Sequence, residues 1–202
     1  ASRSRLEWRW LILVVAFAAV LAVAIMLNTN TTDNSVSKLL GGIKTDNSDL
    51  NVNWERYQSI DVKLSETFKI TESGTYHLTG SLENGQIIVD AGVSEVRIIL
   101  DNVTISNPTG PAILAYNAEN LVIELVGDNV LMDGVFYDSN YDPDVSGVIY
   151  SKADLAFTGK GTLDITANFA DGIVGKDDVV IRDGNYIINA NDDGIRGKDS
   201  VY

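Results

Sequence analysis

Residues 171–179 read DGIVGKDDV, and the same pattern returns 22 positions later as DGIRGKDSV at residues 193–201. A weaker copy, GVIYSKADL, lies upstream at residues 147–155. In all three copies an Ile is followed by Lys three residues later and by Leu or Val six residues later. A repeat of this length, built from short β-type runs, is typical of a β-solenoid in which each repeat forms one coil.

Stacking such coils about 4.8 Å apart aligns equivalent residues in columns. The expected columns are Ile149, Ile173 and Ile195 inside, and Lys152, Lys176 and Lys198 outside. The same stacking places Asp193 beside Asp171. It also places Asp199 beside Asp177. Because adjacent carboxylates repel each other, we expect a positive group between them.

The composition limits the classes of protein to consider. A chain of 202 residues that is 45% hydrophobic can bury the core of one sizeable domain. The absence of Cys excludes disulfides, thiolate metal sites and a catalytic thiol. A formal net charge of −13 argues against nucleic acid as a partner and suits a cation-binding or extracellular surface.

The N-terminal region differs from the rest of the chain. Residues 10–27 form an unbroken apolar run that follows Arg3, Arg5 and Arg9. A cleaved signal peptide is one interpretation, but we expect residues 1–27 to form a basic flank and a retained transmembrane helix. The positive-inside rule then predicts a membrane-anchored protein whose remainder is extracellular, at the cell surface. Residues 28–55 are rich in polar residues and are expected to form a linker.

Short alternating runs follow one another through residues 56–202, with no amphipathic helical stretch among them. The predicted fold is therefore all-β: a right-handed parallel β-helix (β-solenoid) preceded by a single N-terminal transmembrane α-helix. The last repeat stops at Tyr202 without a segment to cover its edge. We therefore expect a domain that is incomplete at its C-terminal end, or one that meets another protein subunit there.

The repeated Asp loops are the first candidate metal site. Calcium takes several oxygen ligands, which carboxylates on adjacent coils would supply. The candidate ligands are Asp171, Asp177, Asp192, Asp193 and Asp199. The alternative is that Asp-Gly and Asn-Asp pairs only form the turns between strands.

The segment 132–146 is the second candidate. Oxygen-bearing side chains alternate along it as at the start of a calcium loop: Asp138, Asn140, Asp142 and Asp144. It lacks the Gly and Glu of an EF-hand, and a solvated acidic loop is the alternative. The segment also carries the aromatic residues Phe136, Tyr137 and Tyr141. Aromatic rings beside carboxylates are typical of a sugar-binding platform, although they would equally well fix a long loop to the domain.

Catalysis has weaker support in the sequence. The single His, His77, lies in an expected strand and is interpreted as structural. Asp192 and Asp193 form a conceivable acid/base pair, and Arg196 or Lys198 a conceivable base for a lyase. Their repeated context favours a turn or metal role, so we do not expect an enzyme.

Three stretches together carry a family resemblance: residues 73–80 (SGTYHLTG), residues 85–105, and residues 171–201. They resemble the bacterial and archaeal carbohydrate-binding domain-containing proteins, parallel β-helices similar in fold to pectate lyases. The resemblance covers the chain from about Ile60 onward. It implies bound calcium in the loops and binding of plant-type polysaccharides such as pectin or cellulose, without established catalysis.

The sequence thus predicts non-catalytic, calcium-dependent binding of a pectin-like or cellulose-like polysaccharide by a membrane-anchored extracellular domain. Two alternatives stay open. One is a structural subunit of a membrane complex or extracellular filament. The other, less favoured, is a polysaccharide lyase or hydrolase.

Overall fold

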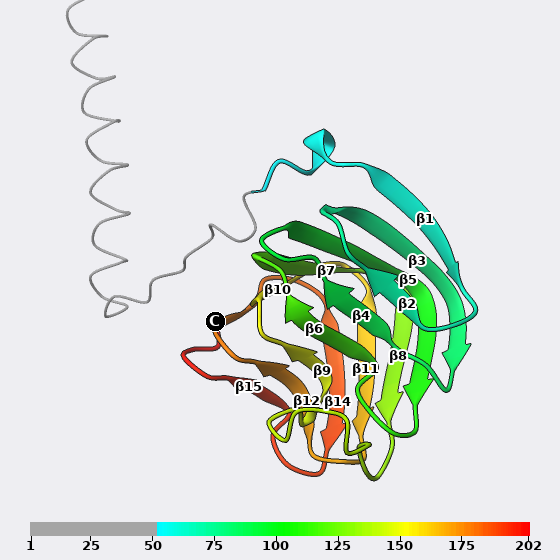
Figure 1. The fold of residues 1–202 in the computed structure, drawn as a ribbon, viewed down its shortest axis with the longest axis vertical. Helices are drawn as coiled ribbons and strands as arrows, with labels where there is room; N and C mark the ends of the chain where they lie inside the picture. Colours follow the sequence, from blue (N-terminus) through cyan, green and yellow to red (C-terminus); the bar gives the residue numbers. More distant parts are fainter. Residues whose placement is uncertain (1–51) are drawn as a thin grey trace, which may run out of the picture. The chain divides into compact units, whose positions relative to one another are not determined.

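Two sheets of parallel strands make up residues 52–202, the part of the chain that this computed structural model describes (Figure 1). Sheet A contains β1 (Ser59–Leu64), β3 (Gly74–Glu83), β5 (Glu95–Asn107), β7 (Asn120–Val126), β8 (Asp128–Asp133), β10 (Asp154–Gly159), β11 (Thr162–Ala167), β13 (Val179–Ile181) and β14 (Asn185–Ala190). Sheet B contains β2 (Phe68–Ile70), β4 (Ile87–Asp90), β6 (Ile113–Asn117), β9 (Gly147–Ser151), β12 (Asp171–Gly175) and β15 (Ile195–Gly197). A short 3-10 helix, η2 (Trp54–Arg56), precedes β1.

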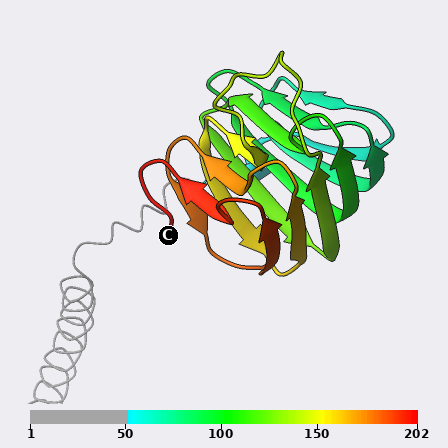
Figure 2. The ribbon, with the colours of Figure 1, turned by 90° about the horizontal axis from the view of Figure 1, so that it is seen from below.

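The chain passes repeatedly between the two sheets (Figure 2). In sheet A the strand β5 pairs with β3, and two rows of strands continue from it: β7, β10 and β13 in one row, and β8, β11 and β14 in the other. In sheet B the strands follow one another in sequence. In sheet B the order is β15-β12-β9-β6-β4-β2. The side chains that point between the sheets form the main core, because alternate residues of each strand turn to the same face.

A column of Ile residues sets the register of sheet B. Ile173 pairs with Ile149 on one side and with Ile195 on the other, as the repeat predicts. The column continues upstream through Ile113 and Ile87. Ile149 and Ile173 are fully buried, and Ile195 on the last strand is partly buried. The repeat therefore identified the inward-facing positions correctly.

The Lys column also lies where the repeat predicts, one residue beyond the strands of sheet B. The backbone N–H of Lys176 donates to the carbonyl of Ser151 at 2.8 Å. The N–H of Lys198 donates to the carbonyl of Gly175 at 3.0 Å. The Lys side chains point outward and remain at least partly exposed.

The predicted fold class, a right-handed parallel β-helix preceded by a transmembrane helix, is wrong. The strands form two curled parallel sheets instead of the regular walls of a helix of uniform coils. The first half of strand β5 pairs with β7, and its second half pairs with β8. One bent strand therefore spans two segments that the sequence pattern predicts as separate short strands. Within residues 52–202 no helix is long and apolar enough to cross a membrane. The predicted membrane segment, residues 10–27, lies outside the described residues.

A left-handed backbone residue lies at the bend both where the strand is continuous and where it is interrupted. Gly80 (φ 91°) lies within β3, and Asn102 (φ 54°) lies within β5. Gly127 (φ 63°) occupies the bend between β7 and β8, where the ladder is interrupted. Because Gly and Asn adopt this conformation readily, the bend is encoded at each position. Whether hydrogen bonding continues through the bend depends on the neighbouring strand.

The register of the Ile column predicts a large effect of a buried charge. Replacing Ile173 by Asp places an unpaired carboxylate in the core, and we expect a loss of more than about 3 kcal/mol of unfolding free energy, or no folding. The matched control is Ile187→Asp on β14, where the side chain is 58% exposed. Chemical denaturation of both variants checks the prediction. An Ile173→Asp protein as stable as the control would contradict the observed register.

Candidate functional site

The β8–β9 loop (residues 134–146) covers the outer face of sheet B. On that face Leu114, Tyr150 and Val174 lie in one column and are buried, although they point away from the main core. Tyr141 and Val145 of the loop pack against them, so the loop and the sheet form a second, smaller core. The loop is therefore held in a defined position beside β12 and β15.

Tyr137 is the principal attachment of the loop. Its ring stacks on Phe169 with the centroids 4.3 Å apart, and its hydroxyl donates to the Asp133 carboxylate at 2.8 Å. Burial raises the pKa of Tyr137 and that of Asp133, which is 3% exposed. Asp133 also accepts from the backbone N–H of Asn168 at 2.6 Å. Asp133 thus links the loop to the turn that precedes β12.

Two carboxylates of the loop meet the Lys column. Asp142 pairs with Lys152 at 3.2 Å, and Asp144 pairs with Lys176 at 3.0 Å. The backbone N–H of Asp144 and the Lys152 ammonium both donate to Asp142, which lowers the pKa of the Asp142 carboxyl. These exposed pairs hold the charged end of the loop beside sheet B, although each contributes little to stability.

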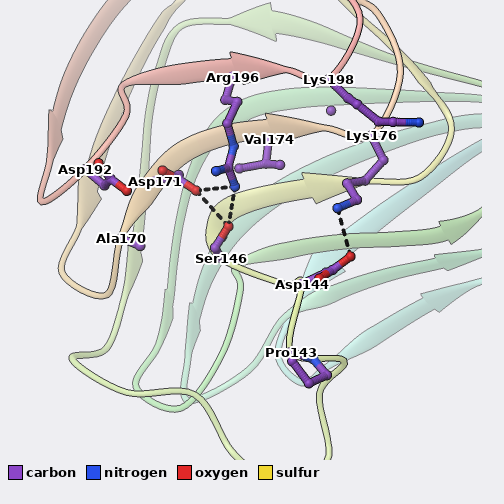
Figure 3. Close-up of a pocket in the computed structure, with 11 residues that line it drawn as sticks. Pro143, Asp144, Ser146, Ala170, Asp171, Val174, Lys176, Asp192, Arg196 and Lys198 are labelled. Carbon is purple, nitrogen blue, oxygen red and sulfur yellow. Dashed lines mark hydrogen bonds and ion pairs between the residues drawn. The ribbon is translucent and has the colours of Figure 1, made fainter.

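A pocket of about 460 Å³ opens between the end of this loop and strands β12 and β15 (Figure 3). Pro143, Ala170 and Val174 form the apolar part of its wall. The charged residues of the lining are Lys176, Arg196, Lys198, Asp144, Asp171 and Asp192. A mixed lining of this kind suits a polar ligand.

Asp171 lies at the edge of the pocket and is 1% exposed. One of its oxygens, Oδ2, accepts from the Ser146 hydroxyl at 2.7 Å and lies 2.7 Å from the Arg196 guanidinium. The other oxygen accepts from the backbone N–H of Asp193 at 3.1 Å. Arg196 also donates to the Ser146 hydroxyl at 2.8 Å. Arg196 therefore supplies a positive charge beside the stacked carboxylates, as the repeat led us to expect.

Three of the predicted metal ligands come together. Asp171, Asp192 and Asp193 each offer an oxygen within 4.8 Å of the other two, and among the described residues they form the one such acidic group. Asp192 and Asp193 are exposed. The remaining predicted ligands lie outside this group: Asp177, Asp199, Asp138, Asn140, Asp142 and Asp144.

The predicted sugar-binding aromatics have different environments. Phe136 is 54% exposed. Tyr137 and Tyr141 are partly buried against the second core, with their ring centroids 5.9 Å apart. The Tyr141 hydroxyl accepts from the side chain of Gln86 at 3.0 Å. Both Tyr residues thus fix the loop, whereas Phe136 presents its ring to solvent.

His77 lies between two carboxylates on the outer face of sheet A. Its Nδ1 is 2.9 Å from Asp61, and its Nε2 is 2.9 Å from Asp101. These hydrogen bonds, led by the one to Asp101, raise the pKa of His77. The imidazole joins β1, β3 and β5, which agrees with a structural role.

Sequence reasoning missed Ser146 and gave Arg196 a different role. One signal was available: the outward column reads Leu114, Tyr150 and Val174, and then changes to Arg196 on the last strand. A charged residue that replaces an apolar one at an equivalent repeat position indicates a local partner. The partner Ser146, 50 residues away in the chain, has no comparable signal.

The Tyr137 contacts predict a measurable effect of removing one hydroxyl. Tyr137→Phe keeps the ring but leaves the buried Asp133 with one fewer donor, and we expect a loss of about 1–3 kcal/mol of unfolding free energy. Tyr57→Phe is the control, because the Tyr57 hydroxyl contacts the exposed Arg56. Urea denaturation compares the two variants. Equal stability of Tyr137→Phe and the unmodified protein would show that this hydrogen bond does not hold the loop.

Comparison with known proteins supports the resemblance seen in the sequence. Residues 65–202 match the family described as carbohydrate-binding domain-containing protein. A protein of that description from Acetivibrio thermocellus is 37% identical over 144 residues, which cover 69% of this chain and 50% of the relative. The chain thus spans about half the length of the curated relative that it matches.

A solved structure is also similar, the gadolinium derivative of a polysaccharide lyase-like protein from C. thermocellum. It has a TM-score of 0.59 and 34% sequence identity, over 65% of this chain and 62% of the other. The family match covers most of the chain and includes all of sheet B, every strand of sheet A except β1, the β8–β9 loop and the pocket beside it. The chain therefore belongs to the family of carbohydrate-binding domain-containing proteins.

Proposed function

We propose that the pocket beside the β8–β9 loop binds a polysaccharide that carries carboxylate groups, as pectin does, without cleaving it. The arrangement of Arg196, Lys176 and Lys198 around the pocket carries this proposal, with Pro143 and Ala170 as the accessible apolar part of its wall. A sugar ring offers C–H groups to an apolar wall, while its hydroxyls and carboxylate take hydrogen bonds from cations. The family and the name of the curated relative support carbohydrate as the ligand.

The charge of the chain favours a local site over general attraction. With a formal net charge of −13, the protein repels an anionic polymer except where cations gather. Lys198 is exposed, and within residues 52–202 no carboxylate lies within ion-pair distance of its ammonium group. Its ammonium group is therefore available to a ligand in the pocket, whereas Arg196 and Lys176 are held in place by Asp171 and Asp144.

A binding role fits the site better than catalysis. A lyase needs a base that is neutral when it removes a proton from the sugar. The Arg196 guanidinium is held by Asp171 and Ser146, and a guanidinium has hydrogen-bond donors but no acceptor with which to take a proton. The name of the curated relative is consistent with binding, although the similar solved structure is described as lyase-like.

Calcium is the cation that we propose for the acidic group. Carboxylate oxygens are the ligands that calcium prefers, and Asp192 and Asp193 are exposed beside Asp171. Both oxygens of Asp171 already accept hydrogen bonds, so Asp192 and Asp193 would supply the principal ligands. Calcium there would neutralise part of the acidic group and supply a positive charge near the pocket. The expected extracellular location, and contact with other subunits at the sheet edge, stay predictions.

The proposed site should bind an acidic sugar more tightly than a neutral one. Titration calorimetry with trigalacturonate should show binding, and with neutral cellotriose much weaker binding. Arg196→Gln should lower the trigalacturonate affinity about tenfold or more, because it removes a charge-assisted hydrogen bond. Lys198→Ala should lower it about threefold without disturbing Asp171.

The control is Lys69→Ala, which removes a Lys that pairs with Asp90 at 2.8 Å on β2, away from the pocket. It should bind as the unmodified protein does. Equal affinity of Lys198→Ala and Lys69→Ala would contradict the assignment of the pocket. Prolonged incubation with pectin should release no unsaturated, ultraviolet-absorbing product, and such a product would overturn the non-catalytic role.

Calcium bound at the acidic group should stabilise the fold. If calcium binds the folded state and not the unfolded state, it adds about 2.7 kcal/mol to the unfolding free energy when its concentration is about 100 times the Kd. The melting temperature should therefore rise with calcium, and this rise should be reduced in Asp192→Asn and Asp193→Asn. The exposed Asp128→Asn is the control. A melting temperature that excess chelator leaves unchanged, in protein without metal by elemental analysis, would refute calcium binding.

A further inference from the structure

A second pocket, of about 370 Å³, lies on the outer face of sheet A. Trp54 of η2 forms one side of it, and strands β5 and β7 form its floor. The turns after β10 and β13 complete it, with Lys160 and Asp183. None of its lining residues belongs to the pocket beside the β8–β9 loop.

Trp54 is held in a fixed position and remains partly exposed. It packs against an outward column of small apolar residues, Val122, Ala156 and Val180. The Tyr57 ring lies 5.6 Å from its ring centroid. The Arg97 guanidinium lies 6.0 Å from the ring on the floor of the pocket. A ring fixed in this way loses little conformational freedom when a ligand stacks on it.

The polar groups of this pocket are arranged around the indole. Arg97 pairs with Glu124, and Lys160 pairs with Asp183 at 2.8 Å. Arg182 is a third cation in the lining. An indole that takes C–H faces, with several fixed donors beside it, matches a sugar that bears a carboxylate.

We propose that this pocket is a second saccharide site, which takes the same class of acidic sugar and makes the domain bivalent for a long polymer. The proposal rests on the proposed function for the class of ligand, but on different residues for the site. Two sites on one polymer raise the local concentration for the second contact, so a long chain binds more tightly than a short one. Trp54 is the stacking residue, and Lys160 and Arg182 contact the carboxylate.

The test counts the binding sites of the full chain by titration calorimetry with trigalacturonate. The unmodified protein should bind two molecules. Trp54→Ala and Arg196→Gln should each weaken one site about tenfold or more, so that the titration detects one bound molecule, and none in the double variant. Binding at the remaining site shows that each single variant is folded. Lys160→Ala should weaken one of the two sites about threefold. Its matched control is Lys69→Ala, since each Lys pairs with one Asp at 2.8 Å.

Each outcome separates the two proposals. If Trp54→Ala still binds two molecules, the second site is refuted and the first remains. The same follows if the unmodified protein binds one molecule and only Arg196→Gln abolishes that binding. If the unmodified protein binds one molecule and only Trp54→Ala abolishes that binding, the second pocket is supported and the first is refuted. A change in the melting temperature of Trp54→Ala without a change in binding would assign Trp54 a purely structural role. No binding by the unmodified protein would refute both.

Discussion

In-register stacking of parallel strands is the constraint on which the rest of the structure depends. The column from Ile87 to Ile195 passes through β4, β6, β9, β12 and β15, and its central members are fully buried. Because side chains alternate along a strand, fixing this column inside also fixes the next residue outside. The outward column that ends in Val174 and Arg196 therefore follows from the inward one, and the pocket with it.

The same stacking brings like charges close together, and different ion-pair partners neutralise them at different places. The outward Lys column meets loop carboxylates, as Lys152 does Asp142 and Lys176 does Asp144. Asp171, buried and close to two other carboxylates, is paired with Arg196. A buried carboxylate without such a partner would be costly. The groups that stabilise the stack are thus also those that give the pocket its polar wall.

The sequence repeat predicted one contact of the site. It placed Asp193 beside Asp171, and the backbone of Asp193 does donate to that carboxylate. The sequence did not distinguish a sugar-binding role of Tyr137 and Tyr141 from attachment of the loop, because both roles use the same residue types. The structure places both rings against the outer face of sheet B. Trp54 gave no sequence signal, since its position relative to Arg97 depends on how η2 packs on sheet A.

What the sequence by itself determined is which residues of β9, β12 and β15 face inward and that these strands are neighbours, because spacings of 24 and 22 residues and strict alternation leave one way to stack the Ile column. It also determined where the chain bends, through Gly80, Asn102 and Gly127. Only the tertiary structure decided that β5 stays continuous through its bend while β7 and β8 separate, since that depends on hydrogen bonds to other strands. It also decided that Ser146 meets Arg196, because contacts between distant segments follow from packing and leave no local pattern.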